Sequence, residues 1–315
     1  MTKLGIIGTG RVGSQVLTDA QYLGVFSEIV LIDTNKDLAH GEALDHHHLQ
    51  GLNHTHHIKT YEGSYQDLAD AEIVIVSASA PATPDMADRT LLTRANSSII
   101  HSVFEQLNQV TQEAVVIVIS NPVDAMTYLG QTSGYPAEKV IGTGTILESS
   151  RFRTLIADHY KVDPKNVEAF LLGEHGSHGV PIWSRVRIHG IELEEFESLT
   201  GNTPIDKNAI SKRIDEVSFE VFQKKGWTNS AISRAAVQLA HAILLNEQSI
   251  EPVSAAVHGE YEFEEGALSL LSLISREGIV KRLPIQLEEA ELQQLTAAHH
   301  FIQQAIEQAL KELKL

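Results

Sequence analysis

The chain of 315 residues contains no cysteine, which excludes disulfide bridges, thiolate metal ligands and cysteine nucleophiles. Basic residues are also scarce: 24 Lys and Arg stand against 41 Asp and Glu, giving a formal net charge of −17. Such a chain lacks the basic footprint that binding of nucleic acid requires. A site for an anionic small molecule would depend on a few local arginines.

Long hydrophobic runs are missing as well. No apolar segment approaches the roughly 20 residues of a membrane-spanning helix. The first apolar run begins at residue 4 and leaves no room for a signal peptide, so we expect a cytoplasmic protein without a membrane partner. Apolar residues nevertheless make up 43% of the chain, enough for a substantial core.

The most informative feature present is a glycine-rich motif, G-T-G-R-V-G, at residues 8–13. An apolar run precedes it, and Asp33 ends the next apolar run twenty residues after Gly13. In this pattern Gly8 permits a tight turn, Gly10 lets the backbone approach a pyrophosphate, and Gly13 allows close helix–strand packing. Asp33 would bind an adenosine ribose and repel a 2′-phosphate, which favours NAD over NADP. A structural turn with Asp33 as a strand-end cap is the alternative.

Short apolar runs alternate with helical patterns in the first half of the chain. The expected strands cover residues 4–7, 29–32, 73–77, 115–119 and 140–141, and the expected helices 12–23, 37–50, 91–108 and 124–132. Continuous β-branched runs separated by helices indicate a doubly wound parallel sheet, a Rossmann-type α/β domain. Its ligand would lie at the carboxyl ends of the strands.

The second half of the chain has a different pattern. Residues 167–172 and 184–188 are expected to be strands, 206–246 mostly helical, 268–274 and 279–283 a hairpin, and 287–315 an amphipathic helix. Antiparallel strands with long helices predict a separate α+β domain. We place the NAD-binding domain at residues 1–145 and the α+β catalytic domain at residues 146–315.

Polar motifs follow several of the expected strands. G-E-H-G at residues 173–176 would aim His175 into a cleft, and S-N-P-V-D at residues 120–124 ends another strand. Glu148 and Arg151 are three residues apart and share one helix face. Taken alone, His175 could be a surface histidine, and Glu148 and Arg151 could form a simple ion pair on a helix. Together, these residues fit one mechanism.

In these motifs and their order, the chain resembles the lactate/malate dehydrogenase family essentially from end to end. The L-lactate and L-2-hydroxyacid branch is more similar than the malate branch. The resemblance implies that His175 is the general acid/base and that the Arg151 guanidinium binds the substrate carboxylate through two parallel hydrogen bonds. Glu148 would orient the imidazole and stabilise its cation.

The resemblance also implies the remaining contacts and partners. Arg89 would close over the site and polarise the carbonyl, Asn121 would bond near the substrate oxygen and nicotinamide, and Thr228 would line the substrate pocket. A homo-oligomer, dimer or tetramer, is expected. The expected NAD contacts are Gly8, Gly10, Val12, Gly13, Asp33, Tyr65, Ser79, Ala80, Ser102, Asn121 and Thr143.

Two features depart from the family pattern. Glu148 replaces the usual Asp, which predicts altered geometry and leaves a catalytically weak NAD-binding protein as an alternative. The loop at residues 81–88 carries neither the Gln of lactate enzymes nor the Arg of malate enzymes. Ala82 and Met86 would tolerate a larger apolar side chain, as in a 2-hydroxyisocaproate-type enzyme, whereas two loop aspartates would repel the second carboxylate of malate. These aspartates are Asp85 and Asp88.

Regulation by a sugar phosphate is predicted to be absent. Many bacterial lactate enzymes bind fructose 1,6-bisphosphate through an arginine and a histidine. Arg153 matches the arginine, but Glu168 stands at the position of the histidine and would repel phosphate. We therefore expect no activation by this ligand.

A histidine-rich segment raises the question of a metal. Three of its histidines are consecutive on an expected helix and point to different faces, unlike the i, i+4 pairs of metal sites. We expect no functional metal there. The histidines are His46, His47, His48, His54, His56 and His57.

Overall fold

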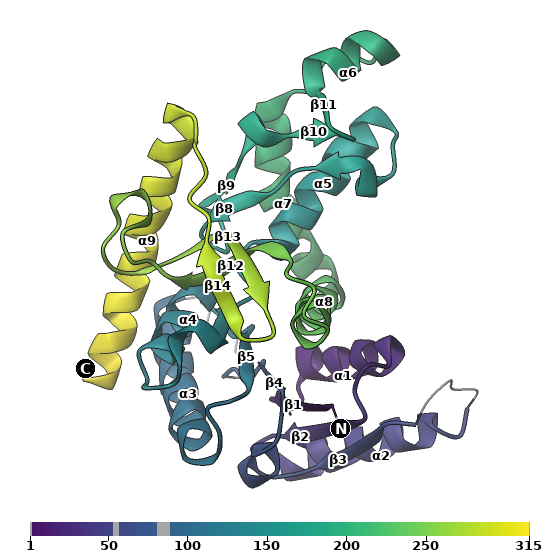
Figure 1. The fold of residues 1–315 in the computed structure, drawn as a ribbon, viewed down its shortest axis with the longest axis vertical. Helices are drawn as coiled ribbons and strands as arrows, with labels where there is room; N and C mark the ends of the chain where they lie inside the picture. The colour runs from purple at the N-terminus through teal and green to yellow at the C-terminus, as the bar shows by residue number, and fades with distance from the viewer. Residues whose placement is uncertain (1, 53–56, 81–88, 315) are drawn as a thin grey trace.

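The computed structural model describes residues 2–52, 57–80 and 89–314, apart from the side chains of residues 89–92. Six parallel strands lie in the order β3-β2-β1-β4-β5-β6 (Figure 1). This order reverses direction at β1 and β4, which creates a crevice for a ligand at the carboxyl ends of the strands. The expected doubly wound α/β fold is confirmed. The strands are β1 (Lys3–Ile7), β2 (Glu28–Ile32), β3 (Lys59–Glu62), β4 (Ile73–Val76), β5 (Val115–Val118) and β6 (Val140–Gly142).

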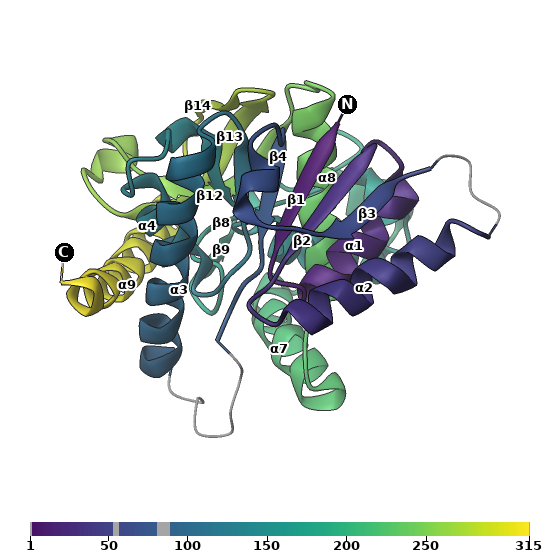
Figure 2. The ribbon, with the colours of Figure 1, turned by 90° about the horizontal axis from the view of Figure 1, so that it is seen from below.

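Helices cover both faces of this sheet (Figure 2). One face packs against α1 (Arg11–Leu23), α2 (Lys36–Leu49) and α8 (Ser230–Leu244). The other packs against α3 (Arg89–Val110), α4 (Val123–Gln131) and α9 (Glu289–Leu313). Because both faces are buried, successive strand residues are apolar instead of alternating with polar ones.

The sheet continues beyond β6 into the second half of the chain. β12 (Ile250–Ala256) pairs antiparallel with β6, followed by β13 (Ala267–Ser275), β8 (Leu171–Gly173) and β9 (Gly179–Pro181). β14 (Gly278–Arg282) pairs with β13 as the expected hairpin. One sheet thus crosses residue 145, and the division into domains at 1–145 and 146–315 stays a prediction.

A third apolar cluster forms the lobe at the top of Figure 1. It joins α5 (Ile146–Tyr160), α6 (Leu193–Thr200) and α7 (Lys207–Lys225) to a small sheet of β7 (Val167–Glu168), β10 (Arg187–Ile188) and β11 (Ile191–Glu192). Phe152 at its centre is fully buried and packs edge-to-face on Trp183. This packing fixes α5, the helix that carries Glu148 and Arg151.

Several local predictions were wrong. Residues 167–172 belong to two strands in different sheets, β7 and β8, and residues 184–188 begin in a 3₁₀ turn (Trp183–Arg185) and form a strand only over the short β10. The sequence patterning missed β3, an edge strand with a polar K-T-Y-E sequence, and β12, which contains a proline and a glutamate. It also missed α6.

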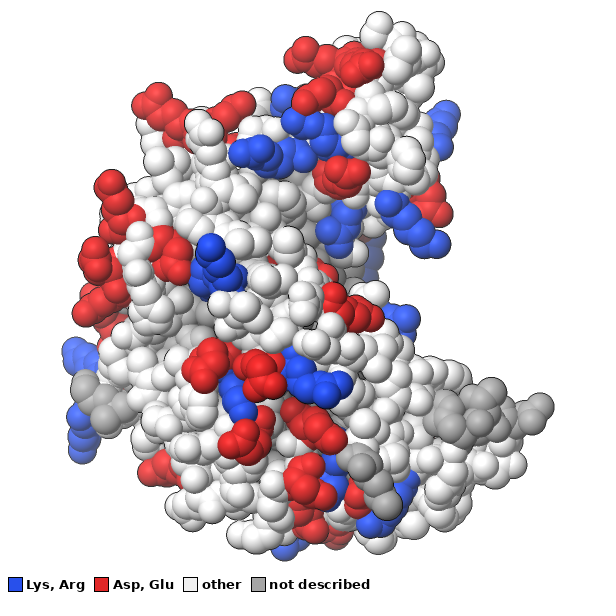
Figure 3. Space-filling view, in the orientation of Figure 1, with Lys and Arg blue, Asp and Glu red and all other residues white. Residues whose placement is uncertain are grey.

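The surface is consistent with the acidic composition. On the face in Figure 3, acidic side chains are spread over both ends of the molecule with basic side chains interspersed. Among the described helices, none is both long and apolar enough to cross a bilayer.

Candidate active site

The glycine turn has the geometry that the motif predicts. Gly8 has a φ of +94°, and a Cβ there would lie 2.5 Å from the Ala78 nitrogen. A Cβ on Gly13 would lie 1.9 Å from the Gly8 carbonyl oxygen. Gly10 caps α1 without a side-chain hydrogen bond, and no atom of the described residues lies within 4 Å of the place its Cβ would take. The first turn of α1 is therefore open to an anion such as a pyrophosphate.

Asp33 lies beside this turn at the end of β2. Its Oδ2 accepts hydrogen bonds from the backbone nitrogen of Thr9 at 2.7 Å and from the Thr9 hydroxyl at 3.0 Å. Its Oδ1 accepts one from the Asn35 nitrogen at 2.8 Å. These donors fix a carboxylate next to the glycine turn, where it suits ribose hydroxyls and disfavours a phosphate.

A cavity of about 320 Å³ lies at the carboxyl ends of β4 and β5, beside the first turn of α1. It gathers Val12, Ser79, Ala80 and Asn121 of the predicted cofactor contacts at one place. His175, Glu148, Arg151 and Thr228 also line it. These eight of the predicted catalytic, substrate and cofactor residues therefore lie together around one cavity at the expected edge of the sheet.

The structure leaves other predicted residues away from this cavity or undescribed. Tyr65 packs against the core from a 3₁₀ turn, Thr143 is buried, and Ser102 is exposed on α3. None of the three lines the two described cavities, so their contacts with NAD stay predictions. Arg89 begins α3, but its side chain lies outside the described residues, as does the loop at 81–88.

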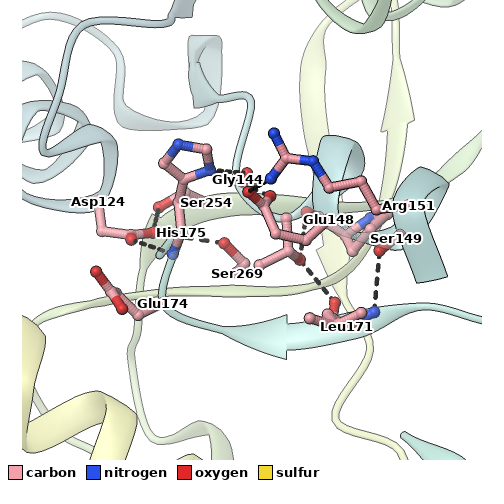
Figure 4. Close-up of polar contacts among 12 residues, drawn as sticks. Asp124, Gly144, Glu148, Ser149, Arg151, Leu171, Glu174, His175, Ser254 and Ser269 are labelled. Atoms are coloured by element: carbon pink, nitrogen blue, oxygen red, sulfur yellow. Dashed lines mark hydrogen bonds and ion pairs between the residues drawn. The ribbon is translucent and has the colours of Figure 1, made fainter. Parts of the chain in front are cut away.

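His175 follows β8 and turns toward the first turn of α5 (Figure 4). Its Nδ1 lies 3.1 Å from the Gly144 carbonyl oxygen and 3.2 Å from Glu148 Oε2. A carbonyl can only accept, so Nδ1 carries the proton in this arrangement. Nε2 is then the nitrogen that can exchange a proton with a substrate.

Glu148 joins the histidine to the arginine. Its Oε1 accepts a hydrogen bond from Arg151 Nη1 at 3.2 Å, while Oε2 faces His175. The Glu148 side chain is 6% exposed and lies in the first turn of α5, where the helix dipole favours a negative charge. Both contacts are longer than the 2.7–2.9 Å typical of charge-assisted bonds.

The charges in this cluster decide its protonation. Burial alone would lower the pKa of His175, but the carboxylates of Glu148, Asp124 and Glu174 outweigh it and raise the pKa to about 9. Burial raises the pKa of Glu148, but His175 and Arg151 outweigh it and hold that pKa below its ordinary value. At neutral pH the site therefore holds an imidazolium beside a carboxylate.

The two halves of the chain match the two parts of one family. Residues 2–142 match the family model for the lactate/malate dehydrogenase NAD-binding domain, and residues 145–313 match the α/β C-terminal domain. The chain belongs to the lactate/malate dehydrogenase family. As a member of this family it is an NAD-dependent oxidoreductase that acts on a hydroxy acid.

Individual relatives agree with this membership. L-lactate dehydrogenase 2 of Clostridium acetobutylicum is 39% identical over 296 residues, covering 93% of this chain and 92% of that one. The minor L-lactate dehydrogenase of Enterococcus mundtii superposes with a TM-score of 0.91 at 30% identity, covering 97% and 98% of the two chains. A malate dehydrogenase of Cryptosporidium parvum reaches 0.89, also at 30% identity, covering 98% and 99%. The fold of the family therefore does not separate lactate from malate enzymes.

The sequence reasoning missed residues that shape this dehydrogenase site. Asn96 on α3 accepts a hydrogen bond from the Ala80 nitrogen at 2.8 Å and donates to the Asn121 carbonyl at 2.6 Å, which ties two cavity loops together. Asp124, which ends the motif at 120–124, accepts a hydrogen bond from the His175 backbone nitrogen at 2.9 Å. Asn96 has no spacing that distinguishes it in the sequence. Asp124 lies in the S-N-P-V-D motif, but its contact with His175 is tertiary and could not be predicted from the motif.

The histidine-rich segment lies apart from the cavities. His46 is buried and its Nδ1 lies 2.7 Å from Gln21 Oε1, whereas His47 and His48 are exposed. His54 and His56 lie outside the described residues. In the part of the chain that the structure describes, no three His, Cys, Asp or Glu side chains are placed to hold a metal ion. The prediction of no functional metal stays a prediction.

Proposed function

We propose that this protein interconverts pyruvate and L-lactate. The observation that supports this proposal is the linked His175–Glu148–Arg151 cluster, a proton donor and a carboxylate-binding group on one cavity wall. The open first turn of α1 and the Thr9-bound Asp33 fit NAD. The reduced cofactor, NADH, would supply the hydride that C2 of the 2-oxo acid accepts, and NAD⁺ would accept a hydride from C2 of the hydroxy acid in the reverse direction.

Three side chains of the protein would transfer the proton, orient the proton donor and bind the substrate. His175 gives the proton on Nε2 to the carbonyl oxygen during reduction and takes it back from the hydroxyl during oxidation. Glu148 holds the ring by Nδ1 and stabilises its cation. Arg151 offers the planar donor pair that matches a carboxylate.

A second candidate is a 2-hydroxyisocaproate-type enzyme for larger apolar 2-oxo acids. A cavity of about 430 Å³ adjoins Arg151 and shares Glu148, Ser218 and Thr228 with the first. Ile214, Phe219 and Phe222 give it apolar walls, and one methylene in such a pocket changes selectivity by only about 1–3 kcal/mol. Asp215 also lines it, so a second substrate carboxylate, as in malate, would meet a negative charge.

Initial rates of NADH oxidation with pyruvate, 2-oxoisocaproate, phenylpyruvate and oxaloacetate test this proposal. We expect fast turnover of pyruvate and little with oxaloacetate. Comparable or faster rates with the bulky acids would assign the second candidate instead. Absence of turnover with all four would contradict both and support an NAD-binding protein without this activity.

The pH dependence follows from the raised pKa of His175. Reduction needs the imidazolium, so kcat/KM for the 2-oxo acid is expected to be level at neutral pH and to fall as pH rises through about 9. Oxidation of the hydroxy acid needs neutral imidazole and is expected to rise over the same range. Initial rates from pH 6 to 10.5 in both directions measure this. A reduction limb near the ordinary histidine value would contradict the raised pKa.

Fructose 1,6-bisphosphate is expected to leave the KM for pyruvate unchanged. Arg153 donates to the Ala169 carbonyl and faces the Glu251 carboxylate, while Glu168 accepts a hydrogen bond from the Gly190 nitrogen. The arginine is therefore already engaged, and a carboxylate stands where phosphate would need a cation. KM with and without the ligand measures this, and a fall of about tenfold would refute it.

We further propose a cytoplasmic homo-oligomer, a dimer or tetramer, without nucleic acid or membrane partners. Leu38 and Leu44 on α2 are 39% and 45% exposed, so this helix carries apolar surface that a second copy could cover.

A further inference from the structure

Asp124 is a buried carboxylate that the mechanism above does not use. It is the second residue of α4 and is 3% exposed. Its Oδ2 accepts the His175 backbone N–H at 2.9 Å, and its Oδ1 accepts the Ser254 hydroxyl and, at 3.4 Å, the Ser269 hydroxyl (Figure 4). These donors lie on β12, on β13 and just past β8, so the carboxylate joins three strands under the catalytic histidine.

Burying the Asp124 carboxylate costs free energy unless hydrogen bonds or opposite charges compensate for the lost water. A buried carboxylate needs donors for its lone pairs, and Asp124 has three plus the N-terminal end of α4. Burial raises the pKa of Asp124 to about 6, with the Ser254 and His175 hydrogen bonds opposing the rise. The group is therefore charged at neutral pH. It lines neither of the two described cavities, so its role is not contact with substrate or cofactor.

The charges around His175 show what Asp124 adds. The Glu148 carboxylate also forms an ion pair with Arg151 on α5, so part of its negative charge is compensated there. Its electrostatic stabilisation of the His175 imidazolium is weaker for that reason. Glu174 is engaged by the His178 nitrogen at 2.8 Å and by the His178 ring. Asp124 holds the backbone of His175 itself, and its own charged neighbours are Glu174, His175 and Arg282 on β14.

We propose that Asp124 is a positioning residue that fixes the backbone of His175 and supplies, beside Glu148, fixed negative charge that keeps the imidazole protonated. The inference rests on the proposed function, because it assigns His175 as the proton donor. The contact of Asp124 with the His175 backbone would set where the His175 Nε2 points. The negative charge of Asp124 would raise the pKa of the His175 imidazole.

The pH profile of Asp124→Asn separates this role from a merely structural one. The amide can still accept the His175 N–H but carries no charge. We expect the basic limb of kcat/KM for pyruvate to move to lower pH by about one unit. Loss of packing alone would lower kcat/KM at every pH without moving the limb. A folded Asp124→Asn protein with the wild-type limb would overturn the proposal.

Ser254→Ala is the matched control, because it removes one donor to Asp124 and leaves the charge in place. Its basic limb is expected to coincide with that of the wild type. A limb that moved as far as in Asp124→Asn would overturn the proposal by showing that any damage to the cluster has this effect.

A measurement on the ligand-free wild-type protein keeps this test independent of turnover and of the folding of Asp124→Asn. In ¹⁵N-histidine-labelled protein, assigned with His175→Gln, the wild-type His175 backbone amide is expected to shift through a step near pH 6 as Asp124 protonates. Absence of that step would overturn the contact. If the step occurs but no 2-oxo acid is reduced, the proposed function fails while the Asp124–His175 linkage stands.

Discussion

Replacing Glu148 with alanine is expected to lower kcat by about four orders of magnitude. The variant removes the acceptor that shares the His175 Nδ1 proton and the partner of Arg151 in one step. Loss of the orienting carboxylate in a comparable triad costs about 10⁴ in kcat. Single-turnover NADH oxidation with saturating pyruvate measures the effect on the proton-transfer step, and the dissociation constant of NADH serves as a check on folding.

Two conservative variants identify which property of Glu148 matters. Glu148→Gln keeps the length and removes the charge, so it should lose most of the rate and lower the pKa of His175. Glu148→Asp keeps the charge but shortens an arm whose present reach is already 3.2 Å to both partners, so an intermediate loss is expected. Unchanged kcat in Glu148→Ala would remove Glu148 from the mechanism and leave, among the described residues, the Gly144 carbonyl to hold the His175 ring.

Local sequence signals predicted the elements on which the site depends. The roles of the glycine motif and Asp33 could be predicted because the strand, turn and helix are contiguous in the sequence. Glu148, Arg151 and His175 were identified through the family resemblance. The parallel strands were recognised because burial on both faces leaves continuous apolar runs. The edge strand β3 lacks that signal, since one side of it faces solvent and its residues are polar.

The connections between these elements could not be predicted from the sequence. Asp124 meets Ser254 across 130 residues and His175 across 51, and Asn96 reaches Asn121 across 25. The periodic pattern of apolar residues in a sequence contains no information about such long-range pairs. The division of residues 167–172 between two sheets has the same origin, because the choice of partner strand belongs to the whole fold.

Replacing Arg151 with lysine is expected to lower kcat/KM for pyruvate by about three orders of magnitude, mostly through KM. Lysine keeps the charge but offers a point donor in place of the planar fork, and the loss corresponds to about 4 kcal/mol. Arg151 pairs with Glu148 at 3.2 Å, so its orientation is set before substrate arrives, and a flexible ammonium would lose that orientation. NADH affinity should stay near the wild-type value.

Arg153→Lys is the matched control, since Arg153 lies two residues along the same helix, donates to the Ala169 carbonyl and lines neither described cavity. Its kcat/KM should stay within a few-fold of wild type. The alternative is that another cationic side chain binds the substrate carboxylate. In that case Arg151→Lys would lose no more than Arg153→Lys, and a large loss on replacing Arg89 would identify that cation. Comparing the three variants with pyruvate and with pyruvamide, which lacks the carboxylate, decides between them, because only the true carboxylate-binding residue discriminates the two substrates.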